Sequence, residues 1–145
     1  MKKYVSLVLF SLLSWAVCAK DFPKVILAGD YPDPTILRDG KDYYMTHSPF
    51  YYAPGFLIWH STDLIHWEPV CRALPEYEGS AMAPDLLKYQ GRYYIYYPTS
   101  TGENYVIYAD NIRGPWSKPV KLDVKGIDPG HVVGEDGKRY LFTNN

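Results

Sequence analysis

An internal repeat is the feature that most constrains what this chain can fold into. Three turn signals, Asp39-Gly40, Gln90-Gly91 and Asp136-Gly137, each separate two runs rich in tyrosine, isoleucine and valine. They recur at intervals of roughly 45–50 residues, and proline or glycine follows every few positions. Helices of useful length are therefore excluded, and with them a helical solenoid. The pattern predicts hairpins of short strands, with further strands at Val25–Leu27, Gly55–His60 and Tyr105–Ala109.

Each repeat has room for about four short strands, which is what one blade of a β-propeller requires. The sequence holds two such repeats and the opening hairpin of a third. Because propellers close with ~4–8 blades, and an unclosed ring exposes its sheet edges, we expect residues 20–145 to be the N-terminal portion of a truncated propeller domain. The predicted fold class is therefore all-β, with about two blades plus the start of a third.

The composition points to a neutral ligand. The formal charge is -1, which gives no electrostatic argument for nucleic acid or for an anionic membrane surface as a partner. Aromatic residues make up 17% of the chain, and tyrosine and tryptophan rings can pack on the apolar face of a sugar. An oligosaccharide or polysaccharide is the partner that this composition favours.

Residues 1–19 resemble a secretory signal peptide. Lys2 and Lys3 form a basic start, an apolar run follows, and Ala19 ends a small-residue cleavage site. The apolar run falls short of the ~20 residues that a membrane-spanning helix needs, so we expect no membrane span. The expected location is secreted or periplasmic, and lipidation at Cys18 is a weaker alternative.

The cysteines and histidines give no sign of a disulfide or a metal site. Once the signal peptide is removed, Cys71 is the remaining cysteine, and we expect a small buried hydrophobe. The histidines at positions 47, 60, 66 and 131 do not have metal-ligand spacing. We therefore predict no metal and no other cofactor.

Aspartates beside prolines mark the start of each repeat. Asp33 lies between Pro32 and Pro34, and the restraint that proline places on its predecessor predicts extended backbone there. Asp85 and Asp128 also adjoin prolines, so we treat the three aspartates as equivalent positions. In a propeller the first strand of each blade lies nearest the axis, which would bring these carboxylates together. Paired carboxylates are suited to cutting a glycosidic bond.

At this point the sequence resembles glycoside hydrolase family 43, whose members are five-bladed β-propeller enzymes acting on arabinofuranosides and xylosides. A single Asp-Pro pair would mean little, whereas five signatures in order at blade spacing are specific. The resemblance covers about residues 25–145 and rests on the segments at 31–36, 55–67, 83–86, 114–116 and 128–129.

The resemblance implies roles for two aspartates. Asp33 matches the general base that activates water, and Asp128 matches the residue that raises the pKa of the general acid and orients it. Inversion at the anomeric carbon would require the acid and the base to be ~6.5–9.5 Å apart. The acid itself is a glutamate of a later blade, so it is not in this chain. Glu103 and Glu135 are expected to be solvated turn residues.

The resemblance also implies substrate contacts. Phe50 aligns with an aromatic residue of the sugar pocket. Met82 stands where relatives often carry tryptophan, and it would give that pocket a softer wall. The family assigns Asp85 no proton transfer, so we expect it to lie beside the substrate or, more simply, to bind backbone amides at the blade entrance.

These features predict an inverting hydrolase of O-glycosyl bonds in β-xylosides or α-L-arabinofuranosides of plant cell-wall polysaccharide, such as xylan or arabinan. The alternative is a non-catalytic carbohydrate-binding propeller, or an inactive gene remnant that lacks the general acid. A channel calcium occurs in some relatives, but no residue of this segment supports one.

Overall fold

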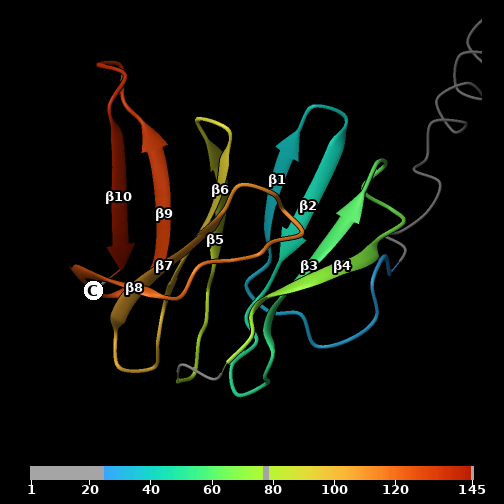
Figure 1. Ribbon diagram of the computed structural model, residues 1–145, viewed down its shortest axis with the longest axis horizontal. Helices are drawn as coiled ribbons and strands as arrows, with labels where there is room; N and C mark the ends of the chain where they lie inside the picture. Colours follow the sequence, from blue (N-terminus) through green and yellow to red (C-terminus); the bar gives the residue numbers. More distant parts are fainter. Residues whose placement is uncertain (1–24, 77–78, 145) are drawn as a thin grey trace, which may run out of the picture.

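The fold is made of antiparallel β-strands (Figure 1). The computed structural model describes residues 25–76 and 79–144. None of these residues belongs to a helix long and apolar enough to cross a membrane. The strands are β1 (Thr35–Asp39), β2 (Asp42–Thr46), β3 (Gly55–Ser61), β4 (Glu68–Leu74), β5 (Asp85–Tyr89), β6 (Arg92–Pro98), β7 (Glu103–Ala109), β8 (Val120–Lys125), β9 (Ile127–Val133) and β10 (Arg139–Asn144).

The strands form two four-stranded sheets and one hairpin, as the repeat predicts. The first sheet has the order β1-β2-β3-β4, the second has the order β5-β6-β7-β8, and β9 pairs with β10. The hairpins turn at Gly40, Gly91 and Gly137, whose φ angles of 65°, 84° and 74° lie in the left-handed region. Glycine adopts that region without steric penalty, which is why these positions signal turns in the sequence.

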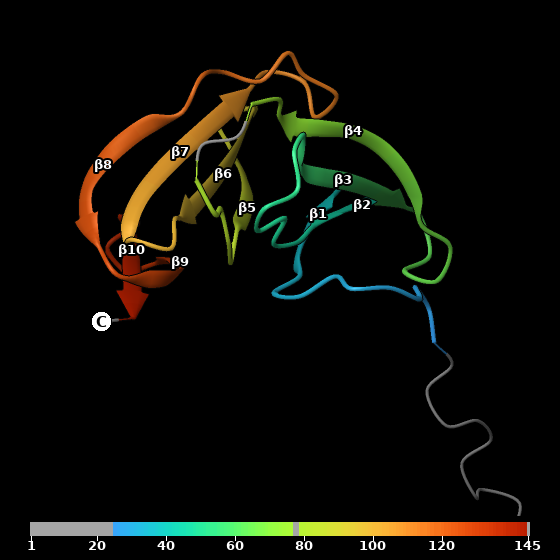
Figure 2. The ribbon, with the colours of Figure 1, turned by 90° about the horizontal axis from the view of Figure 1, so that it is seen from below.

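The sheets are arranged as successive propeller blades. β1 contacts β5, and β5 contacts β9, so the first strand of each blade lies beside the first strand of the next. These inner strands all begin at the lower end of Figure 1. Seen from below, β4 and β8 lie along the outer rim of their blades (Figure 2). Residues at the start of β1, β5 and β9 therefore share one end of the molecule.

The main core lies between the two complete blades. Phe56 and Ile58 of β3 and Ile95 and Tyr97 of β6 have no exposed surface. The rings of Phe56 and Tyr97 meet edge to face with centroids 4.8 Å apart, an arrangement that aromatic quadrupoles favour. Alternate residues of β6 are buried, as expected of a strand whose faces differ in environment.

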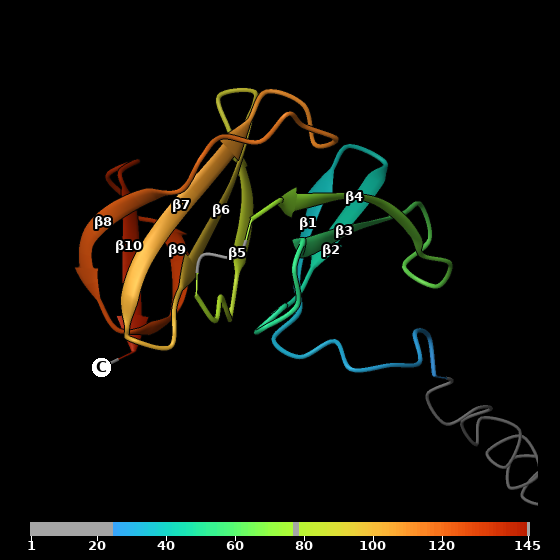
Figure 3. The same ribbon diagram turned by 60° about the horizontal axis from the view of Figure 1, so that its bottom comes forward.

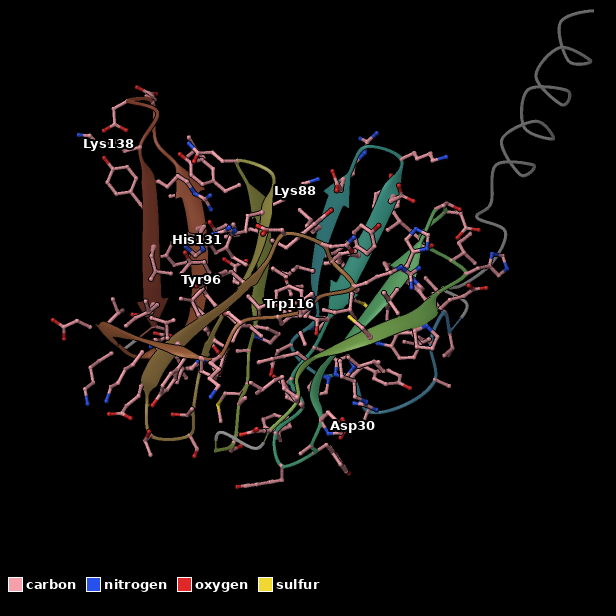
Figure 4. The ribbon with its side chains drawn as sticks, viewed as in Figure 1. Asp30, Lys88, Tyr96, Trp116, His131 and Lys138 are labelled. Atoms are coloured by element: carbon pink, nitrogen blue, oxygen red, sulfur yellow. The ribbon has the colours of Figure 1, made fainter. Side chains whose placement is uncertain are left out.

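Polar contacts fasten the blades together at the end opposite the strand entrances. Lys88 donates to the Asp39 carboxylate at 2.7 Å, and the Tyr93 hydroxyl donates to the same oxygen at 2.6 Å. The Lys88 and Tyr93 hydrogen bonds lower the pKa of Asp39 from its usual value. Lys88 is labelled near the turn of the second blade in Figure 4. The apolar core is thus closed at this end by charged and hydroxyl groups from both blades.

Two elements differ from the sequence prediction. Val25–Leu27 is not a strand; it belongs to a leading segment that crosses the lower end of the first blade (Figure 3). Tyr31 of that segment packs against Trp59, with ring centroids 5.5 Å apart. The strand β8 was not anticipated, although its alternation of apolar and charged residues is a clear period-two signal.

The predicted small buried cysteine is half-buried. The thiol of Cys71 donates to the carbonyl oxygen of Ile112 at 3.3 Å, and burial raises its pKa. The predicted signal peptide, with Cys18, lies outside the described residues.

We expect Phe56→Ala to lower the free energy of unfolding by about 3–5 kcal/mol, because it removes a fully buried ring and leaves a cavity between the blades. Urea denaturation followed by tryptophan fluorescence measures the change. Tyr51, an aromatic residue of the same blade with 76% exposure, provides the matched control, and Tyr51→Ala should change stability by less than about 0.5 kcal/mol. Equal effects of the two substitutions would contradict the interblade core.

Candidate active site

The entrances of the three inner strands share an unusual backbone conformation. Asp33, Ala83 and Asp128 have φ angles of 51°, 37° and 52°, and a proline follows each of them. Left-handed backbone is uncommon for residues with a side chain and costs roughly 1–3 kcal/mol, so it persists only where surrounding structure imposes it. The prediction of extended backbone at Asp33 is therefore wrong.

This geometry corrects the assignment of equivalent residues. The second-blade counterpart of Asp33 and Asp128 is Ala83, and Asp85 lies two positions further along. Asp85 opens β5 just as Thr35 opens β1, so these two are the matching strand residues. The order of residues explains the error, because the carboxylate precedes proline in the first and third blades and follows it in the second. A carboxylate directly before the proline is therefore found in the first and third blades and not in the second.

Asp85 binds a histidine of the neighbouring hairpin, where backbone amides had been expected. Its Oδ2 lies 2.5 Å from Nδ1 of His131, and both side chains are largely buried. The His131 ring also packs against Tyr96, with centroids 4.3 Å apart (Figure 4). The pair therefore links the second blade to β9 near the inner strands.

Asp33 is held by Ser48, a residue that the sequence analysis did not single out. The Ser48 hydroxyl lies 2.6 Å from Oδ2 of Asp33, and it accepts the backbone N–H of Ala83 at 2.6 Å. The backbone N–H of Ser48 donates to the carbonyl oxygen of Pro32 at 3.0 Å. Ser48 is 3% exposed, whereas Asp33 is exposed, so a buried serine supports a carboxylate that faces outward.

Asp128 is also exposed at the entrance of its strand. It is the second residue of β9, and its side chain makes no hydrogen bond within the described residues. β5 contacts both β1 and β9, so the entrances that carry Asp33 and Asp128 flank the entrance that carries Ala83. The structure thus places the two predicted catalytic carboxylates at one end of the inner strands.

The predicted substrate contacts, Phe50 and Met82, lie at the same end. The backbone N–H of Phe50 donates to the carbonyl oxygen of Ala81 at 3.0 Å, and that of Met82 donates to Pro98 at 3.1 Å. Both side chains are half-buried. Phe50 also lines a cavity of about 400 Å³, whose aromatic walls are Tyr31, Phe50, Tyr52 and Trp59. The loop after β2, which carries Phe50, is therefore bound through its backbone to the loop before β5, which carries Met82.

The two glutamates that were expected in solvated turns, Glu103 and Glu135, lie in different places. Glu135 lies in the turn between β9 and β10, as predicted, but Glu103 opens β7 at the end where the inner strands begin. Lys121 donates to Glu103 at 2.5 Å and holds the pKa of that carboxyl below its usual value. A carboxyl held ionised in this way is poorly suited to donate a proton. Within residues 25–76 and 79–144, no three His, Cys, Asp or Glu side chains gather closely enough to hold a metal ion.

His47 supports the loop that carries Ser48. Its ring is 8% exposed, and Nδ1 lies 3.2 Å from the carbonyl oxygen of Ser48. The Tyr31 ring packs on it with centroids 4.9 Å apart. Burial lowers the pKa of His47 because the charged ring would lose its hydration.

Comparison with known proteins places these blades in a family. The model of "Glycosyl hydrolases family 43" matches residues 22–145, and the chain belongs to that family. The resemblance that the sequence motifs indicated is thereby confirmed. The all-β propeller prediction is also confirmed, since the solved structures that the chain resembles are family 43 proteins.

Curated relatives include a xylosidase/arabinosidase of Butyrivibrio fibrisolvens, 38% identical over 128 residues, which cover 79% of this chain and 25% of that protein. A non-reducing end α-L-arabinofuranosidase of Bacteroides ovatus is 32% identical over 162 residues, which cover 99% of this chain and 30% of that protein. The chain therefore spans less than a third of the length of these relatives.

Two solved structures show the same fold. A family 43 protein of the xyloglucan locus of Bacteroides ovatus superposes with a TM-score of 0.77 at 32% identity, over 86% of this chain and 27% of the other. A family 43 protein of Bacillus licheniformis gives 0.74 at 34% identity, over 85% and 29%.

We expect stability to fall on acidification because of His47. An unfolded histidine titrates near pH 6.5, and buried His47 titrates lower, so the unfolded chain takes up the proton first. The stabilisation is present above about pH 6.5 and is lost as the pH falls below it, by at most about 1.4 kcal/mol per pH unit. Urea denaturation at pH 7, 6 and 5 should show a steeper loss for the unaltered protein than for His47→Gln. Parallel curves would contradict the buried neutral ring.

Proposed function

We propose that this chain forms the N-terminal blades of an inverting glycoside hydrolase in which Asp33 is the general base. In this proposal Oδ1 of Asp33 takes a proton from the water that attacks the anomeric carbon. Asp128 raises the pKa of a general acid supplied by a later blade, because a nearby negative charge disfavours ionisation of that acid. The general base thus comes from the first blade, and the residue that raises the pKa of the acid comes from the third.

The observation that carries the proposal is the shared backbone geometry of Asp33 and Asp128. Both lie in the strained left-handed conformation before a proline, both are exposed, and both sit where an inner strand begins. Backbone strain of this kind clusters at functional sites, and among the described non-glycine residues with positive φ these two are the carboxylates. Asp33 also has one carboxylate oxygen held by Ser48, while Oδ1 has no partner within the described residues. A fixed carboxylate with a free oxygen is what a general base requires.

The proposed substrates are β-xylosides or α-L-arabinofuranosides of plant cell-wall polysaccharide. Family membership and the activities named for the relatives support this class of sugar. Phe50 and Met82 would pack against the apolar face of the bound residue. We also propose that the protein is exported to the periplasm or secreted, because its substrate is extracellular polymer and residues 1–19 resemble a signal peptide.

We expect Asp33→Asn to lower kcat/KM by ~10²–10⁴-fold in the full-length protein, because the amide cannot accept the proton from water. Folding should be normal, since the amide oxygen can still accept the Ser48 hydrogen bond. Nitrophenyl β-xyloside and α-L-arabinofuranoside are the substrates, and circular dichroism checks the fold. Asp110, which follows β7 and whose side chain is 82% exposed, is the matched control, and Asp110→Asn should retain activity. Full turnover by Asp33→Asn would contradict the base role of Asp33, whereas no turnover by the unaltered full-length protein would favour the carbohydrate-binding propeller.

Inversion at the anomeric carbon is a separate prediction. Proton NMR of the first product formed from a β-xyloside should show α-xylose, which later equilibrates by mutarotation. Initial formation of β-xylose would indicate a covalent intermediate, which requires carboxylates only ~5–5.5 Å apart and a different role for Asp33.

A further inference from the structure

Ser48 makes contacts at the strand entrances for which the family resemblance assigns it no role. It belongs to the loop after β2, which the sequence analysis noted for Phe50 alone. Yet Ser48 contacts the residue before Asp33, Asp33 itself, and the second-blade counterpart Ala83. One buried side chain therefore joins the first two strand entrances.

The hydrogen bonds of Ser48 can run in one direction only. A hydroxyl has a single proton to donate and lone pairs that accept. The N–H of Ala83 can only donate, so it occupies a lone pair of Oγ at 2.6 Å. The Ser48 proton is then free to point at Oδ2 of Asp33, also 2.6 Å away, and no other acceptor for it lies within the described residues. A separation of about 2.5–2.7 Å is typical of a hydroxyl bound to an ionised carboxylate.

A protonated Asp33 would disrupt this arrangement. If Oδ2 carried the proton, it would donate to the second lone pair of the Ser48 oxygen, and the buried Ser48 hydroxyl would lose its acceptor. A buried donor without a partner costs about 1–3 kcal/mol. We call the hydrogen bonds of Ser48 to Asp33 and Ala83 the Ser48 clamp. It suits an ionised carboxylate whose Oδ2 is hydrogen-bonded and whose Oδ1 is free.

The clamp is also rigid. The backbone N–H of Ser48 donates to the carbonyl oxygen of Pro32 at 3.0 Å. Ser48 is therefore hydrogen-bonded to the backbone directly before Asp33 as well as to the Asp33 side chain. The His47 ring lies against the Ser48 carbonyl on the other side. Pro32 and Pro34 limit the remaining backbone freedom. Rotation of the carboxylate that would exchange Oδ1 and Oδ2 would break the Ser48 bond.

We propose that Ser48 is the positioning residue of the base: it takes up Oδ2 of Asp33 and so selects Oδ1 as the oxygen that receives the proton from water. The donor to Ser48 comes from Ala83, so this orientation forms only when the second blade docks on the first. The inference rests on the proposed function of Asp33.

Ser48→Ala in the full-length protein should lower kcat about 10- to 100-fold with KM unchanged within about twofold, because a carboxylate that can rotate is less often aligned with the water. Ser48→Thr keeps the hydroxyl and should recover most of the rate. The matched control is Ser61, the last residue of β3, which is 2% exposed and whose hydroxyl donates to Asp63 and accepts two backbone N–H groups. Ser61→Ala removes the same kind of bridge far from the strand entrances and should leave kcat unchanged.

A double variant separates positioning from general support. If Ser48 acts through Asp33, Ser48→Ala should cause no further loss of kcat in the Asp33→Asn background. A further loss of the same size there, or an unchanged kcat for Ser48→Ala alone, would overturn the positioning role while leaving the base role of Asp33 intact. Turnover by Asp33→Asn at the rate of the unaltered protein would instead overturn the proposed function. Should Ser48→Ala not fold, Ser48→Cys supplies the comparison, because its thiol has a similar size and donates weakly.

Discussion

Neither four-stranded sheet can bury an apolar face by itself, so each depends on face-to-face packing with its neighbour. Phe56 and Ile58 of the first blade meet Ile95 and Tyr97 of the second in a core with no exposed surface. This contact sets the angle between blades and therefore where β1 and β5 begin. The hydrogen bond from Ala83 to Ser48, which joins the first two strand entrances, depends on that docking.

The aspartates at the two ends of the interblade contact differ in their hydrogen bonds. At the turn end, Lys88 and Tyr93 both donate to Asp39, and their hydrogen bonds satisfy a carboxylate at the edge of the core. At the entrance end, Asp33 keeps one oxygen free and accepts a single side-chain bond from Ser48. Two donors, one of them charged, stabilise the Asp39 carboxylate, whereas the Asp33 carboxylate has a single neutral donor and is more available for chemistry.

The second blade carries no carboxylate at the position equivalent to Asp33 and Asp128. Ala83 has the left-handed backbone at that position, and its N–H donates a hydrogen bond to Ser48 of the first blade. The carboxylate that follows, Asp85, binds His131 of the hairpin β9–β10. Each blade thus uses its strand entrance differently, with outward carboxylates in the first and third and a connecting role in the second. This division matches a site that needs charges set apart, because adjacent carboxylates would repel one another.

The sequence by itself determined the repeat, the hairpin turns and the family, because turn glycines, period-two alternation and ordered motifs are local signals. It also placed Asp33 and Asp128 at strand entrances, because prolines adjoin them. Only the tertiary structure decided that Ala83, and not Asp85, is their counterpart, because φ at a residue before proline depends on how the blade is held. Likewise Ser48 carries no local signal. Its contacts join residues far apart in sequence, and the one with Ala83 exists only once the second blade has packed on the first.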